Sequence, residues 1–200
     1  MYEISVAVVA ILLIISGVDY ARRAWFGETS PVLATWILML VMMGLSFAMY
    51  WGSPRSSWGG NIAVTAGVLN LTIILTGVVV AGLRHKTLVM EFAPLQRWCL
   101  VAGGVMVVVW FITKEPLASY TLVQCIALVA YIGTVQRLRR AKGSTEPYFL
   151  WMAVLLSSVL AIYPAWVKND LFSWIYLGRT IPSTAGVIIL IAQAKRREVS

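Results

Sequence analysis

Apolar residues fall into seven long runs, separated by short segments rich in Gly, Pro and charged residues. Long apolar runs of this kind are typical of helices that lie in lipid. We predict helices at about residues 3–21, 31–51, 60–83, 98–113, 117–136, 147–167 and 171–193. Each run is close to the roughly 17–25 residues that cross a bilayer, and helices satisfy their own backbone polar groups there.

Composition agrees with a chain that is mostly surrounded by lipid. Of the 200 residues, 60% are hydrophobic and only 12% are charged, about half the charged fraction of a soluble domain. We therefore expect an all-α membrane protein whose first partner is the lipid bilayer. The net charge of +8 follows from membrane topology, so it does not indicate a nucleic-acid partner.

The basic residues gather on one side of the predicted membrane. Seven crossings place the loops at about 22–30, 84–97 and 137–146 on the same side as the C-terminus. That side carries twelve basic residues and the other side three, Arg55, Lys114 and Lys168. The positive-inside rule makes the basic side cytoplasmic. We expect the N-terminus outside and the C-terminus in the cytoplasm.

A shift of 116 positions superposes the two halves of the sequence. In both halves a basic segment is followed by a Gly-to-Pro turn, an apolar helix and a second turn. The matching pairs are Gly27 with Gly143, Pro31 with Pro147, and Trp58 with Trp174. We therefore predict seven transmembrane helices in a 3+1+3 arrangement. Two parallel three-helix repeats, residues 1–86 and 117–200, flank a connection and linker helix at 87–116.

This plan, together with the segment Val135–Glu146, resembles the SWEET and PQ-loop superfamily, which includes SemiSWEET and PnuC-type transporters. Gln136 matches the Gln of the family's Pro-Gln turn, and a basic stretch and Ser144-Thr145 follow it. Val135 stands where the family has Pro, and Asp19-Tyr20 occupy the equivalent pair in the first half. The resemblance implies a transporter of a sugar, vitamin or similar solute in a bacterial inner membrane, and leaves a homo-oligomer open.

Arg179 is an arginine inside an apolar run, the predicted helix at 171–193. A guanidinium at the centre of a bilayer costs at least about 2.5 kcal/mol, so such residues face a bundle interior or a wet cavity. Pro182 follows it and removes one backbone donor, which is typical of a bent helix. One interpretation is a substrate-lining residue, and the other is an anchor that extends toward the interface.

Further polar and aromatic residues are candidates for the same site. In the resembling transporters an Asn on the third helix of each repeat contacts substrate, which points to Asn70; Asn61 is a second candidate on that helix. The alternative role of these asparagines is an interhelical hydrogen bond. Gln124 and Tyr131 are positioned to line a central cavity, and Tyr176 to offer a ring face.

Several Trp and Tyr residues lie near predicted helix ends, among them Trp36 and Trp151. We interpret these as the aromatic belts of the two membrane interfaces. The alternative is a stacking pocket for a flat ring.

The sequence contains no catalytic motif and no His/Cys cluster with metal-ligand spacing. We expect no enzyme, no metal and no cofactor. Two functions remain: a transporter or facilitator with a site between the repeats, and a non-transporting membrane scaffold or subunit of the same architecture. Polar residues facing one central cavity favour the first, and a polar strip on the outer surface favours the second.

Overall fold

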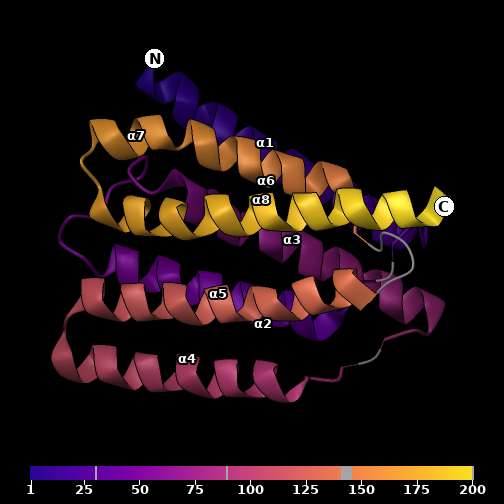
Figure 1. The fold of residues 1–200 in the computed structure, drawn as a ribbon. Helices are drawn as coiled ribbons and strands as arrows, with labels where there is room; N and C mark the ends of the chain where they lie inside the picture. Colours follow the sequence, from indigo (N-terminus) through magenta and orange to yellow (C-terminus); the bar gives the residue numbers. More distant parts are fainter. Residues whose placement is uncertain (30, 89, 141–145, 200) are drawn as a thin grey trace.

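The computed structural model describes residues 1–29, 31–88, 90–140 and 146–199, without the side chains of residues 130, 133, 134, 137, 140, 198 and 199. The described residues form a bundle of helices (Figure 1). The helices are α1 (Tyr2–Trp25), α2 (Leu33–Trp51), α3 (Ile62–His85), α4 (Pro94–Thr113), α5 (Pro116–Arg140), α6 (Tyr148–Leu160), α7 (Ile162–Val167) and α8 (Leu171–Val199).

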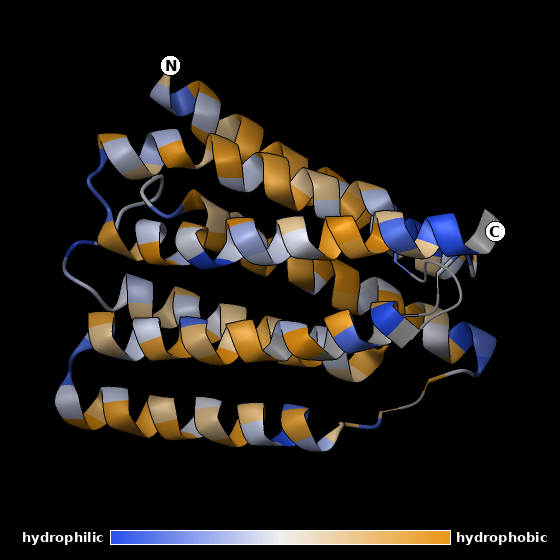
Figure 2. Cartoon of the chain, viewed as in Figure 1, coloured by the Kyte–Doolittle hydropathy of each residue, from blue (hydrophilic) through white to orange (hydrophobic). Residues whose placement is uncertain are grey.

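Six helical segments in the described chain are long and apolar enough to cross a membrane, with α6 and α7 together counting as one of them. A shorter apolar stretch, Pro116–Val129, lies in α5. The hydrophobic residues fill the middle of the bundle, and hydrophilic residues gather at its ends (Figure 2). The prediction of an all-α membrane protein is therefore confirmed.

The helix boundaries differ from the predicted ones at a few ends. Helix α4 begins at Pro94, inside the segment predicted as a connection. The side chain of Gln96 accepts a hydrogen bond from the Ala93 amide at 3.0 Å and donates one to Thr35 of α2 at 3.1 Å. These bonds satisfy a free amide at the helix start and fix α4 to α2. Within the segment Val135–Glu146, residues 141–145 lie outside the described ranges.

The predicted helix at 147–167 is divided into α6 and α7 at Ala161. Pro164 has no amide hydrogen, so it leaves the carbonyl of Leu160 without its usual helical donor. The hydroxyl of Ser5 in α1 donates a hydrogen bond to this carbonyl at 3.1 Å. The proline therefore explains the break, and α1 supplies the missing donor.

The helices that precede α4 in the sequence and those that follow it show the same pattern of packing contacts. Helix α3 packs between α1 and α2, and α8 packs between α5 and α6. Across the bundle, α1 contacts α6 and α2 contacts α5. Helix α4 packs on α5 and α2 at one edge of the bundle (Figure 1).

Helices α1 and α3 approach each other closely because small residues lie between them. A Cβ atom added to Gly17 of α1 would lie 2.6 Å from Oδ1 of Asn70 in α3. Small residues commonly allow membrane helices to approach at this distance. The absence of a side chain at Gly17 therefore leaves room for Asn70, which lines the cavity described below.

The two ends of the bundle differ in charge. One end carries the C-terminal part of α8 and the basic residues Arg22, Arg84, Arg97 and Arg196; we call it the basic end. The opposite end carries the turns at 52–61, 114–115 and 168–170, and we call it the Asp170 end. The first residues of α1 also lie at the Asp170 end (Figure 1).

Candidate functional site

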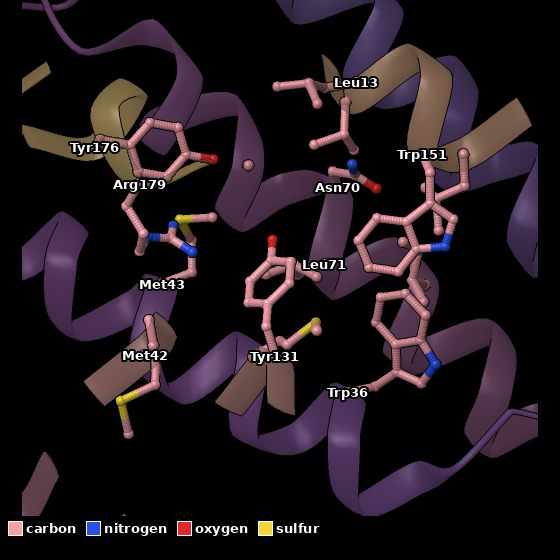
Figure 3. Close-up of a pocket in the computed structure, with 16 residues that line it drawn as sticks. Leu13, Trp36, Met42, Met43, Asn70, Leu71, Tyr131, Trp151, Tyr176 and Arg179 are labelled. Atoms are coloured by element: carbon pink, nitrogen blue, oxygen red, sulfur yellow. The ribbon is translucent and has the colours of Figure 1, made fainter. Parts of the chain in front are cut away.

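A cavity lies at the centre of the bundle and is lined by α1, α2, α3, α5, α6 and α8 (Figure 3). Its volume is about 70 Å³ when measured with a water-sized probe. This space holds several water molecules but is smaller than the roughly 300–1,000 Å³ pockets that enclose drug-sized ligands. The cavity therefore suits a small solute.

Arg179 lines this cavity from α8, two turns into the helix. Its Nε donates a hydrogen bond to Oε1 of Gln124 in α5 at 2.7 Å. Among the described residues no carboxylate pairs with it, because both ion pairs found there belong to Arg23. Arg179 therefore brings an uncompensated positive charge to the cavity wall.

A chain of hydrogen bonds fixes the plane of the Arg179 guanidinium. Gln124 is buried, and its Nε2 donates to the hydroxyl of Ser46 in α2 at 2.7 Å. Ser46 in turn donates to the carbonyl of Met42 at 2.8 Å. Three helices thus hold one side chain in a single orientation, which preorganises its remaining donors.

Two tyrosine rings flank the guanidinium. The Arg179 Cζ lies 5.1 Å from the ring centroid of Tyr176 and 5.6 Å from that of Tyr131. Both tyrosines line the cavity, and the phenol of Tyr131 extends into its middle (Figure 3). Cation–π contacts at these distances stabilise a charge in a partly dry environment.

The opposite end of the cavity is apolar and aromatic, with Trp36 and Trp151 beside each other (Figure 3). Each tryptophan is only 4% exposed, so our interpretation of the two as interfacial belt residues is wrong. Trp36 donates from Nε1 to the hydroxyl of Tyr20 at 3.2 Å. The buried Nε1 of Trp151 has no hydrogen-bond partner among the described residues.

Asn70 lines the cavity from α3 and is buried. Its Nδ2 makes a long hydrogen bond of 3.5 Å to the Ser16 hydroxyl, and its Oδ1 has no partner in the described part of the chain. An unpaired buried carbonyl costs about 1–3 kcal/mol. This oxygen packs against Gly17 of α1, where an added Cβ would lie 2.6 Å from it.

A buried hydrogen-bonded cluster, centred on Tyr50 of α2, lies at the Asp170 end. The Tyr50 hydroxyl is 2.9 Å from both Oδ2 of Asp170 and the carbonyl of Ser57, and it has one proton to donate. It accepts a hydrogen bond from the Ser57 amide at 2.9 Å. Asp170 also accepts one from the Ser173 amide at 3.2 Å and so caps the start of α8.

Two further bonds connect α3 and its preceding turn to α5 and α8 at this end. The Ser173 hydroxyl donates to the Gly60 carbonyl at 2.8 Å. Asn61 Nδ2 donates to the Tyr120 hydroxyl at 3.2 Å. The Phe172 ring packs edge-on against both Tyr50 and Tyr120, with centroid distances of 5.6 and 5.0 Å. This end of the bundle is therefore closed by buried polar and aromatic contacts.

The structure brings four of the six predicted site residues to the cavity wall. These are Arg179, Asn70, Tyr131 and Tyr176. Gln124 lies behind the wall and holds Arg179. Asn61 lies outside the cavity, within the closed end.

The sequence reasoning missed Trp36, Trp151 and the Tyr50–Asp170 contact. Spacing along one helix carries no signal for a bond between residues 120 positions apart. For the tryptophans, one sign was available in the sequence: they occupy nearly matching places in the two halves, at positions 36 and 151. Comparisons with protein-family models, with curated proteins and with solved structures find no match.

Proposed function

We propose that this protein is a membrane transporter or facilitator of a small polar solute, which binds in the central cavity between two three-helix units. The units are α1–α3 and α5 with α6–α8, and α4 connects them. The helices pack in the same order within each unit. The contacts between the units, α1–α6 and α2–α5, are also equivalent, because α1 corresponds to α5 and α2 to α6. Both features support this arrangement. Parallel repeats of this kind are one plan of secondary transporters, with the solute between the halves.

The observation that carries the proposal is the convergence of intramembrane polar side chains on one cavity. Asn70 comes from one unit, and Tyr131 and Arg179 from the other. A scaffold that binds other membrane proteins would instead carry polar or small residues along its outer surface. Buried polar groups inside a membrane protein mark solute or ion pathways by default.

In the proposed orientation the Asp170 end faces the outside of a bacterial inner membrane and the basic end faces the cytoplasm. The contacts of Tyr50, Asp170 and Ser173 then close the outer side of the cavity. They join the two units, so opening toward the outside requires them to break. Alternating access follows if these contacts form and break while the cavity keeps its solute.

The proposal is tested by flux into liposomes that contain the purified protein. The panel consists of sugars, vitamins, amino acids and small carboxylates, and uptake is compared with empty liposomes. Ala127→Phe places a ring at the cavity wall, whereas Val105→Phe adds the same ring on an exposed position of α4. We expect one solute class to cross, with flux abolished by Ala127→Phe and retained by Val105→Phe.

Two results would contradict the proposal. One is the absence of protein-dependent flux for every member of the panel. The other is equal flux through wild type and a folded Ala127→Phe variant, which would place the pathway elsewhere.

A further inference from the structure

The central cavity has a charge that nothing in its wall balances. Among the lining residues that the structure describes, Arg179 is basic and none is acidic. The nearest polar partner, Gln124, is neutral. An arginine inside a membrane protein is costly unless an anion or a carbonyl compensates it. A bound anionic solute would therefore balance the charge of Arg179.

The donors left over on Arg179 define the geometry of that anion. The bond to Gln124 uses Nε, so the two terminal nitrogens, Nη1 and Nη2, have no hydrogen-bond partner among the described residues. These two nitrogens form a planar fork whose spacing matches the two oxygens of a carboxylate. The bonds of Gln124 and Ser46 keep the fork in place before any solute arrives.

The rest of the cavity determines what the anion is attached to. Away from Arg179 the wall consists mostly of apolar and Trp side chains, including Leu71, Ile74 and Trp151. The guanidinium and the two tryptophans lie on opposite sides of the cavity (Figure 3). A second charge on the solute would have to enter this apolar part unpaired, at high cost. A neutral polar substituent would still meet Asn70, which also lines the cavity.

We propose that the cavity binds a small monocarboxylate with a compact apolar body. The carboxylate pairs with the Arg179 fork between the Tyr131 and Tyr176 rings, and the apolar body extends toward Trp36 and Trp151. This inference rests on the proposed function in one respect, because it takes the central cavity as the solute site. It adds the chemical class, which the proposed function leaves open.

Binding to the purified protein in detergent tests the class, since detergent removes any contribution from passive diffusion across a bilayer. Calorimetry compares sodium propionate with propionamide, which has nearly the same shape and no charge; both are small enough for a cavity of about 70 Å³. We expect propionate to bind about tenfold to a hundredfold more tightly, because charge-assisted hydrogen bonds replace neutral ones. Equal binding of the two compounds would overturn the assignment.

Two variants locate the binding. In Arg179→Leu propionate affinity should fall to that of propionamide for wild type, whereas Arg55→Leu, in an exposed loop, should leave it unchanged. Gln124→Glu keeps the shape of the wall and gives Arg179 a permanent carboxylate partner. We expect this variant to fold even if Arg179→Leu does not, and to lose propionate affinity by tenfold or more. Full propionate affinity in Gln124→Glu would contradict the proposal.

Inorganic phosphate tests whether the cavity requires an apolar body as well as a negative charge. Phosphate carries the charge and lacks the apolar body, so it should bind far more weakly than propionate. If phosphate binds as tightly as propionate and its binding depends on Arg179, the cavity is a general anion site and the monocarboxylate class is overturned.

The failures of this inference and of the proposed function are distinguishable. If neutral solutes cross liposomes and propionate does not bind, the transport proposal is supported and the monocarboxylate assignment is wrong. If propionate binds through Arg179 and no solute crosses, the binding site is supported and the transport proposal is wrong.

Discussion

The Asp170 end and the cavity differ in how their polar groups connect the two halves of the bundle. At the Asp170 end, Tyr50, Asp170 and Ser173 form hydrogen bonds to the other half. In the cavity, Asn70 Oδ1 and Trp151 Nε1 have no partner among the described residues. Buried atoms without a partner also occur at the Asp170 end, where Asn61 Oδ1 is one, so the difference lies in the bonds that cross between the halves. Such bonds stabilise contact between the halves, and the Asp170 end has several of them.

The largest expected effect concerns the side of the membrane on which each end lies. In a background of Cys99→Ala and Cys125→Ala, Arg55→Cys at the Asp170 end should react with an impermeant maleimide added to intact cells. Lys195→Cys at the basic end should react only after the membrane is permeabilised, because in the proposed orientation this end faces the cytoplasm. The reverse pattern would invert the orientation, and labelling of both would break the seven-helix count.

Asp170→Ala should produce the largest loss of stability. It removes the carboxylate that binds both the Tyr50 hydroxyl and the Ser173 amide in a buried place. We expect the free energy of unfolding in detergent to fall by about 2–3 kcal/mol, because the Ser173 amide loses its cap and the Tyr50 hydroxyl keeps only the Ser57 carbonyl as acceptor. Glu115→Ala, at an exposed turn of the same end, is the control and should change little. Equal melting curves for the two variants would mean that the cluster does not close this end.

Tyr50→Phe should have a smaller effect, since the ring still packs on Phe172 while the hydroxyl is lost. We expect a decrease of about 1–2 kcal/mol in the free energy of unfolding. Tyr163→Phe removes an exposed hydroxyl at the same end and serves as the matched control. If the Tyr50→Phe variant is as stable as this control, the Tyr50 hydroxyl does not stabilise the closed Asp170 end.

The smallest effect distinguishes the two tryptophans of the cavity. Trp36→Phe loses a hydrogen bond to Tyr20, whereas Trp151→Phe loses an indole N–H that has no partner. Both lose similar ring area, so the difference in unfolding free energy isolates the bond, at about 0.5–1.5 kcal/mol. If Trp151→Phe proves the more destabilising of the two, its indole N–H has a partner such as bound water.

The helices could be predicted from the sequence because lipid leaves few alternatives to long apolar helices. Arg179 and Asn70 could be singled out for a related reason, since polar residues are rare in such runs. The break at Ala161 was not predicted, although Pro164 is its cause. Trp36 and Trp151 were misplaced because a tryptophan near a helix end suits both an interface and a cavity.

The hydrogen bonds of the Asp170 end could not be predicted for a different reason. Tyr50 and Asp170 belong to elements 120 positions apart, and their contact depends on how the halves pack. Local patterns fix which face of a helix is apolar, and they do not fix which helix covers it. Gln124 was placed near the cavity by its position on α5, but its bond to Arg179 needed the packing of α5 against α8.

The break between α6 and α7 has a mechanical consequence when it is set beside the unbroken α8. On α6, the wall residues Leu150 and Trp151 are separated from the Asp170 end by a joint at Ala161. On α8, Ser173 and Arg179 lie on one continuous rod. If the Asp170 end opens as proposed, the joint on the first helix would absorb the displacement, and the continuous second helix would transmit it to Arg179. Under that proposal the guanidinium, and not the tryptophan wall, would respond to the opening of the far end.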